Sequence, residues 1–253
     1  GGGVKCWGRG NYGQLGYDST DDKGDSAGEM AGLGTVDLGA SAIAITAGFE
    51  HTCAILDGGG VKCWGYGGNG QLGYDSTDSM GDEAGEMAGL GTVNLGAGAI
   101  AIAAGHRHTC AILDGGGVKC WGHGGYGQLG YDSTDSMGDE AGEMAGLGTV
   151  NLNASAIAIT AGNHHTCAIL VGGGVKCWGR GSYGRLGYDS SDNKGGAVGE
   201  MAGLGTVNLG ASAIAIAAGN LHTCATLDGG GVRCWGGSGE GQLGYDGTDN
   251  KGS

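Results

Sequence analysis

The chain has 253 residues, of which 65 are glycine and none is proline. Its formal charge is −14, from 12 basic and 26 acidic residues. Because phosphate contacts need clustered Lys and Arg, this balance argues against a nucleic-acid partner. No run of 18 apolar residues occurs, so we expect no membrane span. No basic start followed by an apolar run is recognisable, so we expect no signal peptide in this chain.

The tripeptide Cys-Trp-Gly recurs every 57 residues without insertion or deletion. It begins at Cys6, Cys63, Cys120, Cys177 and Cys234. A tandem array of one supersecondary unit shares a continuous core between neighbours, so we expect a single region over 1–253 rather than separate domains. The units are a partial one at 1–41, full ones at 42–98, 99–155 and 156–212, and a partial one at 213–253.

Within one unit, the pattern predicts four short strands joined by glycine-rich turns. In the unit 99–155 they lie at 99–104, 108–113, 118–121 and 128–131. The turn at 114–117 holds an aspartate and three glycines, which tolerate positive φ. An acidic segment at 132–143 then leads to the next unit. Four short antiparallel strands make a propeller blade. The alternative is one coil of a β-solenoid, for which 57 residues is long.

The expected fold class is therefore all-β, a β-propeller built of four-stranded blades. The length corresponds to about 4.4 units, from 253 residues at 57 per unit. Residues 1–25 correspond to residues 229–253, so the two ends duplicate each other rather than complement each other. We expect a partial propeller or a segment of a longer chain.

Eight of the nine cysteines form pairs ten residues apart. The pairs are Cys53 with Cys63, Cys110 with Cys120, Cys167 with Cys177, and Cys224 with Cys234. In a hairpin with a three-residue loop, such positions face each other with Cα atoms about 4.5 Å apart. This separation suits a disulfide, so the spacing predicts one disulfide in each hairpin and leaves Cys6 without a partner.

Metal binding at each His-Thr-Cys is the competing interpretation of the cysteines. A tetrahedral site needs four ligands, and one unit offers two cysteines and one histidine. Disulfides imply an oxidising compartment, so we expect an extracellular or cell-surface protein.

Two further residues recur in every full unit. The tryptophans of Cys-Trp-Gly are predicted to pack between blades, with the indole N–H bonded to a backbone oxygen. The histidines His51, His108, His165 and His222 have no nucleophile or acid beside them in the pattern. We interpret them as structural hydrogen-bonding residues, and we expect no catalytic residue and no enzyme.

The block His108-Thr-Cys-Ala-Ile-Leu-Asp, followed by Val118-Lys-Cys-Trp-Gly and Tyr126-Gly-Gln-Leu-Gly, resembles the regulator-of-chromosome-condensation repeat. The segment from Gly138 to Met144 resembles the cysteine-containing subgroup of secreted proteins in that family. The resemblance covers the whole chain. It implies a β-propeller, usually of seven blades and related to beta-lactamase-inhibitor propellers. It also implies binding to protein partners, since family roles include nucleotide exchange on a small GTPase and enzyme inhibition.

Chain reversal at each turn places the turns before His-Thr-Cys and after Cys-Trp-Gly at one end of the blades. These turns vary between units and combine aromatic, Arg and His side chains, which suits contacts with a protein or a glycan. Neutral variation of solvated loops is the alternative. The predicted partner-binding residues are Phe49, Glu50, Tyr66, Asn69, His106, Arg107, His123, Tyr126, Asn163, His164, Arg180 and Tyr183. The glycine hairpins and the acidic segments are expected at the opposite end.

The acidic segments repeat five carboxylates per unit. Those of two units are Asp75, Asp78, Asp82, Glu83 and Glu86, then Asp132, Asp135, Asp139, Glu140 and Glu143. Oxygen-rich loops can bind Ca²⁺, but acidic runs are usually solvated, so we expect no cofactor, with Ca²⁺ as the alternative. Asn153-Ala-Ser155 is an N-glycosylation sequon and predicts a glycan in a secreted chain.

Together these features predict an extracellular, non-enzymatic scaffold for binding or for structure. It presents the variable turns to a protein or glycan and can be a subunit of a filament or surface assembly by self-association. The alternative function is that of a regulator of one protein partner, such as an enzyme inhibitor or an exchange factor.

Overall fold

The computed structural model describes residues 2–252. Each of four successive units contributes one three-stranded antiparallel sheet, with its strands in chain order. The first two sheets are β1 (Ala42–Ala47), β2 (His51–Leu56) and β3 (Val61–Gly65), then β4 (Ala99–Ala104), β5 (His108–Leu113) and β6 (Val118–Gly122). The last two are β7 (Ala156–Ala161), β8 (His165–Leu170) and β9 (Val175–Gly179), then β10 (Ala213–Ala218), β11 (His222–Leu227) and β12 (Val232–Gly236). We call the sheets, with the segments that follow them, blades 1 to 4.

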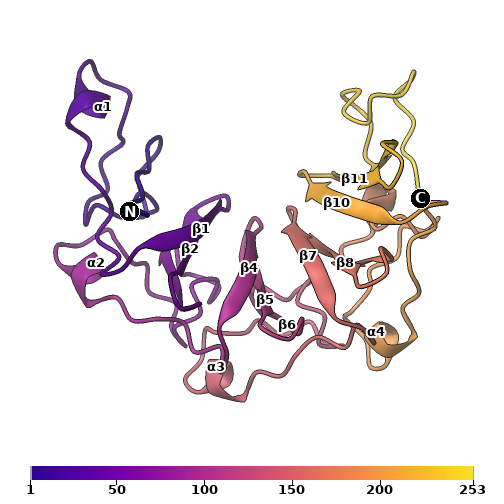
Figure 1. Ribbon diagram of the computed structural model, residues 1–253, viewed down its shortest axis with the longest axis horizontal. Coiled ribbons are helices and arrows are strands. Elements are labelled where there is room, and N and C mark those ends of the chain that lie inside the picture. Colours follow the sequence, from indigo (N-terminus) through magenta and orange to yellow (C-terminus); the bar gives the residue numbers. More distant parts are fainter. Residues whose placement is uncertain (1, 253) are drawn as a thin grey trace.

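The four blades follow one another around an open arc (Figure 1). The strands β1, β4, β7 and β10 lie on the inner side of the arc. One-turn helices lie along its outer rim: α1 (Glu29–Gly32), α2 (Glu86–Gly89), α3 (Glu143–Gly146) and α4 (Glu200–Gly203). A 3₁₀ turn, η1, spans Ser182–Gly184. No helix in the described part of the chain is long and apolar enough to cross a membrane.

The predicted fourth strand is wrong, because residues 128–131 form a turn. The hydroxyl of Tyr131 in this turn accepts a hydrogen bond from the backbone N–H of Cys120, at 2.9 Å. This bond satisfies a donor on the outer edge of β6 that a fourth strand would otherwise have to pair. The chain returns to this edge only at its two ends, where Met137 bridges Gly122 and the N–H of Val150 donates to the carbonyl oxygen of Val118 at 2.8 Å.

The acidic segments also lie elsewhere than predicted. Met137 pairs with Gly122 through an isolated bridge, and Gly122 is the last residue of β6, directly before the variable turn at 123–127. The acidic segment therefore starts at the same end of the blade as the variable turns, not at the opposite end. The physical reason is the missing strand, because the chain does not cross the blade before the segment begins.

The predicted hairpins and disulfides are present. Cys110 faces Cys120 in the β5–β6 register, and the bond between them joins Cα atoms 4.0 Å apart. The equivalent bonds in the other blades join Cα atoms 4.0–4.1 Å apart. Gly115 and Gly116 in the hairpin turn have φ values of 95° and 84°, as the glycine run predicts. Cys6 is a free thiol, and burial raises its pKa to about 11.

The core lies between blades rather than within each blade. The Trp121 ring of blade 2 packs against Cys53, Ile55 and Leu72 of blade 1 and is fully buried. The predicted bond from the indole N–H to a backbone oxygen forms at Trp235, which donates to Arg185 at 3.0 Å. The indole N–H groups of the three fully buried tryptophans, Trp121 among them, have no partner.

Aspartates also tie each blade to the next. The carboxylate of Asp75 accepts the backbone N–H groups of Gly142 and Met144, at 3.0 and 2.9 Å, at the start of α3 in the next blade. Asp18 and Asp132 make the same pair of bonds to α2 and α4. A carboxylate at a helix N-terminus satisfies donors that have no partner within the helix.

Candidate functional site

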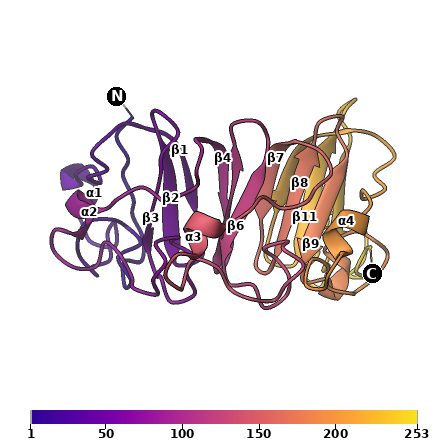
Figure 2. The same cartoon turned by 90° about the horizontal axis from the view of Figure 1, so that it is seen from below.

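The variable turns gather at the same end of every blade and therefore on one face of the arc, which Figure 2 shows from the side. We call this face the loop face. It consists of the turns 48–50, 105–107, 162–164 and 219–221 before β2, β5, β8 and β11, and the turns 66–70, 123–127, 180–184 and 237–241 after β3, β6, β9 and β12. All twelve predicted partner-binding residues belong to these turns. The structure joins six of them into one network of ring contacts and leaves the other six beside it.

The network starts at Phe49, whose side chain is 63% exposed. Its ring stacks on His106 of the next blade, with the ring centroids 4.4 Å apart and the planes at 26°. His106 lies 5.6 Å from His164 of the third blade. The contacts therefore cross two blade boundaries.

The other branch of the network comes from the turns after the third strands. His164 lies 4.9 Å from the ring of Tyr126 and 6.0 Å from that of His123. The guanidinium carbon of Arg180 lies 4.9 Å from the centroid of Tyr126, which is a cation–π contact. Nδ1 of His123 hydrogen-bonds to Nε2 of Gln128 at 2.8 Å.

The remaining predicted residues make local contacts. Tyr66 packs on Tyr12, with centroids 5.0 Å apart, and the side-chain amide of Asn163 donates to Asn220. Tyr183 lies 5.6 Å from the guanidinium carbon of Arg185. The other three take part in hydrogen bonds of the backbone. The carbonyl oxygen of Arg107 accepts the N–H of His123 at 2.8 Å, and that of Glu50 accepts the N–H of Tyr66. The backbone N–H of Asn69 donates to the side-chain oxygen of Gln71.

The histidines of the network are held neutral. Partial burial lowers the pKa of His106 and of His123, and nearby Arg107 lowers both further. Burial lowers the pKa of His164 to about 4, with added repulsion from His106, His123, Arg180 and Arg185. The carboxylate of Glu50 partly offsets this effect at His106, because its negative charge raises the pKa of that histidine.

Arg185 belongs to this face but is absent from the sequence prediction. Its side chain is fully buried, with Nε donating to the carbonyl oxygen of Ser182 at 2.9 Å and Nη1 to that of Asn220 at 3.4 Å. Burial lowers its pKa to about 10, so it stays charged at neutral pH. The signal in the sequence is a substitution, since the other repeats have glutamine here, at Gln14, Gln71, Gln128 and Gln242.

Beneath the turns lies a row of buried histidines that fixes the blade spacing. Thr109 donates its hydroxyl hydrogen to the carbonyl oxygen of Gln71 at 2.9 Å, so Nε2–H of His51 must donate to Thr109, at 2.8 Å. His108 and His165 make the same bond to the threonine of their next blade. The interpretation as structural hydrogen-bonding residues is confirmed for His51, His108 and His165. An added Cβ at Gly105 would lie 2.5 Å from the carbonyl oxygen of Gly162, so only glycine lets the turns approach this closely.

Backbone N–H groups bind two of the five carboxylates that suggested Ca²⁺ in each segment, the first aspartate and the last glutamate. One oxygen of Glu143 accepts the N–H groups of Gly138, Asp139 and Glu140, at 2.8, 3.2 and 3.0 Å. Within residues 2–252, no three His, Cys, Asp or Glu side chains are placed to hold one metal ion. Asn153 is exposed in a turn with φ of 60°, and its Nδ2, the atom that a glycan would modify, donates to the carbonyl oxygen of Ala202 at 2.9 Å.

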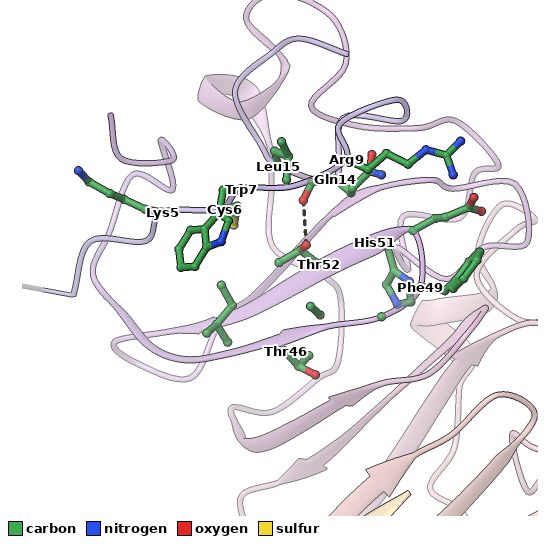
Figure 3. Close-up of a pocket in the computed structure, with 14 residues that line it drawn as sticks. Lys5, Cys6, Trp7, Arg9, Gln14, Leu15, Thr46, Phe49, His51 and Thr52 are labelled. Atoms are coloured by element: carbon green, nitrogen blue, oxygen red, sulfur yellow. Dashed lines mark hydrogen bonds between the residues drawn. The ribbon is translucent and has the colours of Figure 1, made fainter. Parts of the chain in front are cut away.

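Two hollows adjoin the loop face. One, of about 550 Å³, is on the inner side of the arc between the turns that start at Gly48, Gly105, Gly162 and Gly219. The other, of about 480 Å³, lies beside blade 1 and is drawn in Figure 3, where Cys6 and Trp7 lie across from Thr52 and His51. The hydroxyl of Thr52 donates to the carbonyl oxygen of Gln14 there, at 2.8 Å.

Comparisons with known proteins identify the repeat. The profile of the regulator of chromosome condensation (RCC1) repeat matches residues 42–71, 99–128, 156–185 and 213–242, which cover the three strands of each blade and the loop-face turn after them. Human E3 ubiquitin-protein ligase HERC2 is 34% identical over 143 residues, 56% of this chain and 3% of the ligase. The ultraviolet-B receptor UVR8 of Arabidopsis thaliana is 29% identical over 245 residues, 95% of this chain and 50% of the receptor. The chain thus spans half or less of the length of these relatives.

Two solved structures share the fold. Human WBSCR16 superposes with a TM-score of 0.75 at 21% identity, over 97% of this chain and 60% of that chain. Prp20p from Saccharomyces cerevisiae superposes with a TM-score of 0.67 at 22% identity, over 86% of this chain and 51% of that chain. These similarities confirm the all-β propeller class predicted from the repeat.

Proposed function

We propose that the chain, which carries four RCC1 repeats, is a non-enzymatic scaffold that binds a protein partner through the loop face. The observation that carries this proposal is the network that joins Phe49, His106, His164, Tyr126 and Arg180 across three blades. Aromatic side chains and arginine are the residues that contribute most to protein interfaces.

Two further considerations support a protein partner. The strands repeat almost unchanged between blades, while the turns of the loop face differ, so any specificity has to come from the turns. The solved structure of Prp20p was described together with its binding to Gsp1p and histones. For the present chain we propose a protein contact of the same general kind, without carrying over those partners.

A peptide selection tests the loop-face proposal. A random peptide library is selected on the immobilised chain, and the recovered peptides are rebound to a variant with Phe49, His106 and Tyr126 changed to alanine. We expect binding to fall at least about tenfold, the loss of about 1.4 kcal/mol typical of one interface anchor. The control variant changes Asp114, Val171 and Asp228 to alanine, three exposed residues at the opposite end, and should bind normally. Equal binding to both variants would remove the loop face from the proposal.

We also propose an extracellular or cell-surface location, supported by four disulfides that close four hairpins. Thiol alkylation of the chain isolated from its natural source, without reductant, checks this. We expect the eight cysteines of the four hairpins to remain unlabelled. Nine labelled cysteines would place the chain in a reducing compartment.

A further inference from the structure

Five basic side chains gather on the loop face, namely three arginines and two histidines that are held neutral at pH 7. They are Arg107, His123, His164, Arg180 and Arg185, which we call the basic cluster. The one ion pair found within residues 2–252 joins Lys23 to Asp21, so no arginine of the cluster is paired with a carboxylate.

Several nitrogens of the cluster have no hydrogen-bond partner. They are Nη2 of Arg185, Nε of Arg107 and Nδ1 of His164. A buried guanidinium without a compensating charge is unfavourable, and arginine does not lose its proton near neutral pH. The groups that surround His164 from the neighbouring turns, His106, His123, Arg180 and Arg185, all repel its protonated form. Every charge near the centre of the cluster therefore has the same sign.

From this geometry we propose that the basic cluster binds an acidic polypeptide segment of the partner, with its carboxylates against the half-buried Arg107 and Arg180 and above the buried charge of Arg185. The aromatic rings of Tyr126 and Tyr183, which lie against the guanidinium groups of Arg180 and Arg185, provide the flat surface beside them. Guanidinium groups favour carboxylates because two parallel N–H donors match the two oxygens. This inference rests on the loop face being the partner-binding surface.

A phosphate chain is the competing anion, and the rest of the chain disfavours it. The carboxylates Asp75, Asp78 and Asp82 and their equivalents start from the same end of the blades, on segments beside the loop face. A nucleic acid extends its charge over many contacts and would meet these acidic segments. A short acidic peptide can contact the cluster alone.

The test uses a fluorescent peptide of eight glutamates and measures its anisotropy with the whole chain at pH 7 and low salt. The negative net charge repels such a probe in general, so binding reports a local site. R185Q and R180Q should each weaken binding about fivefold or more, and R233Q, which removes one exposed charge from β12, should change it less than about 1.5-fold.

R185Q is built to keep its fold. Glutamine occupies this position in the other four repeats, where its side-chain oxygen accepts a backbone N–H, as Gln128 does from Tyr126 at 2.8 Å. A peptide of eight glutamines should not bind. Absence of octaglutamate binding, or equal losses in R185Q and R233Q, would overturn the inference, and so would tighter binding of an eight-nucleotide oligothymidylate. Loop-face peptides recovered from the library would leave the proposed function standing in each of these cases.

Discussion

Replacing Trp121 by alanine should lower the free energy of unfolding by about 3–5 kcal/mol, the usual loss for a large aromatic side chain in a core. Trp121 is fully buried and fills the space between blades 1 and 2 against the Cys53–Cys63 disulfide. Its removal leaves a cavity at a blade boundary, where each blade relies on its neighbour for most of its apolar contacts. Urea unfolding followed by circular dichroism, without reductant, gives the difference.

Trp7 is the matched control for this substitution. It occupies the same position of the repeat, but its side chain is 63% exposed. Replacing Trp7 by alanine should change the free energy of unfolding by less than about 0.5 kcal/mol. Equal losses for the two variants would show that the tryptophan stabilises each repeat by itself rather than the boundary between blades.

Acid should destabilise the fold through the row of buried histidines. Burial lowers the pKa of His51 to about 4 and that of His165 to about 3, and it holds the pKa of His108 well below 6.5. The Nδ1 atoms of all three are buried without a partner, so an added proton would find no acceptor there. Folding therefore favours the neutral rings.

The direction of the pH dependence follows from proton uptake by the unfolded chain. Between pH 6.5 and about 4 the unfolded chain binds up to three protons on these histidines that the folded chain does not, so stability falls as the pH falls through this window. The lowered pKa values of His106, His123 and His164 act in the same direction. At about 1.4 kcal/mol per proton and pH unit, three histidines give a steepest slope of about 4 kcal/mol per pH unit. The raised pKa values of Asp82 and Asp139 have the opposite sign and reduce this slope.

Urea midpoints measured from pH 7.5 to 4.5 check the slope. His108→Gln is the matched variant, since an amide N–H can donate to Thr166 in place of the imidazole, which lies 2.9 Å from it. The variant should lose about 1.4 kcal/mol per pH unit of the steepest slope, which is the share of one histidine. An unchanged dependence would mean that the carboxylates, and not the buried histidines, control acid unfolding.

Local sequence was sufficient to predict the units, three of the four strands in each, the hairpin turns and the cysteine pairing. These features depend on contacts between residues close in the chain. Alternation places Cys110 opposite Cys120, and the glycines at 115 and 116 supply the positive φ that the hairpin needs. The 57-residue period then repeats each local solution, which also predicted the turns that make up the loop face.

The tertiary structure decided what the period could not show. A fourth strand fails because the hydroxyl of Tyr131 and the return of the chain at Val150 already satisfy the edge of β6. The placement of the acidic segments follows from that failure. The ring network and the environment of Arg185 arise from turns of different units, such as Phe49 with His106 and Arg185 with Asn220, brought together by the stacking of blades. Contacts across a blade boundary depend on the packing angle between sheets, and no pattern within one unit encodes that angle.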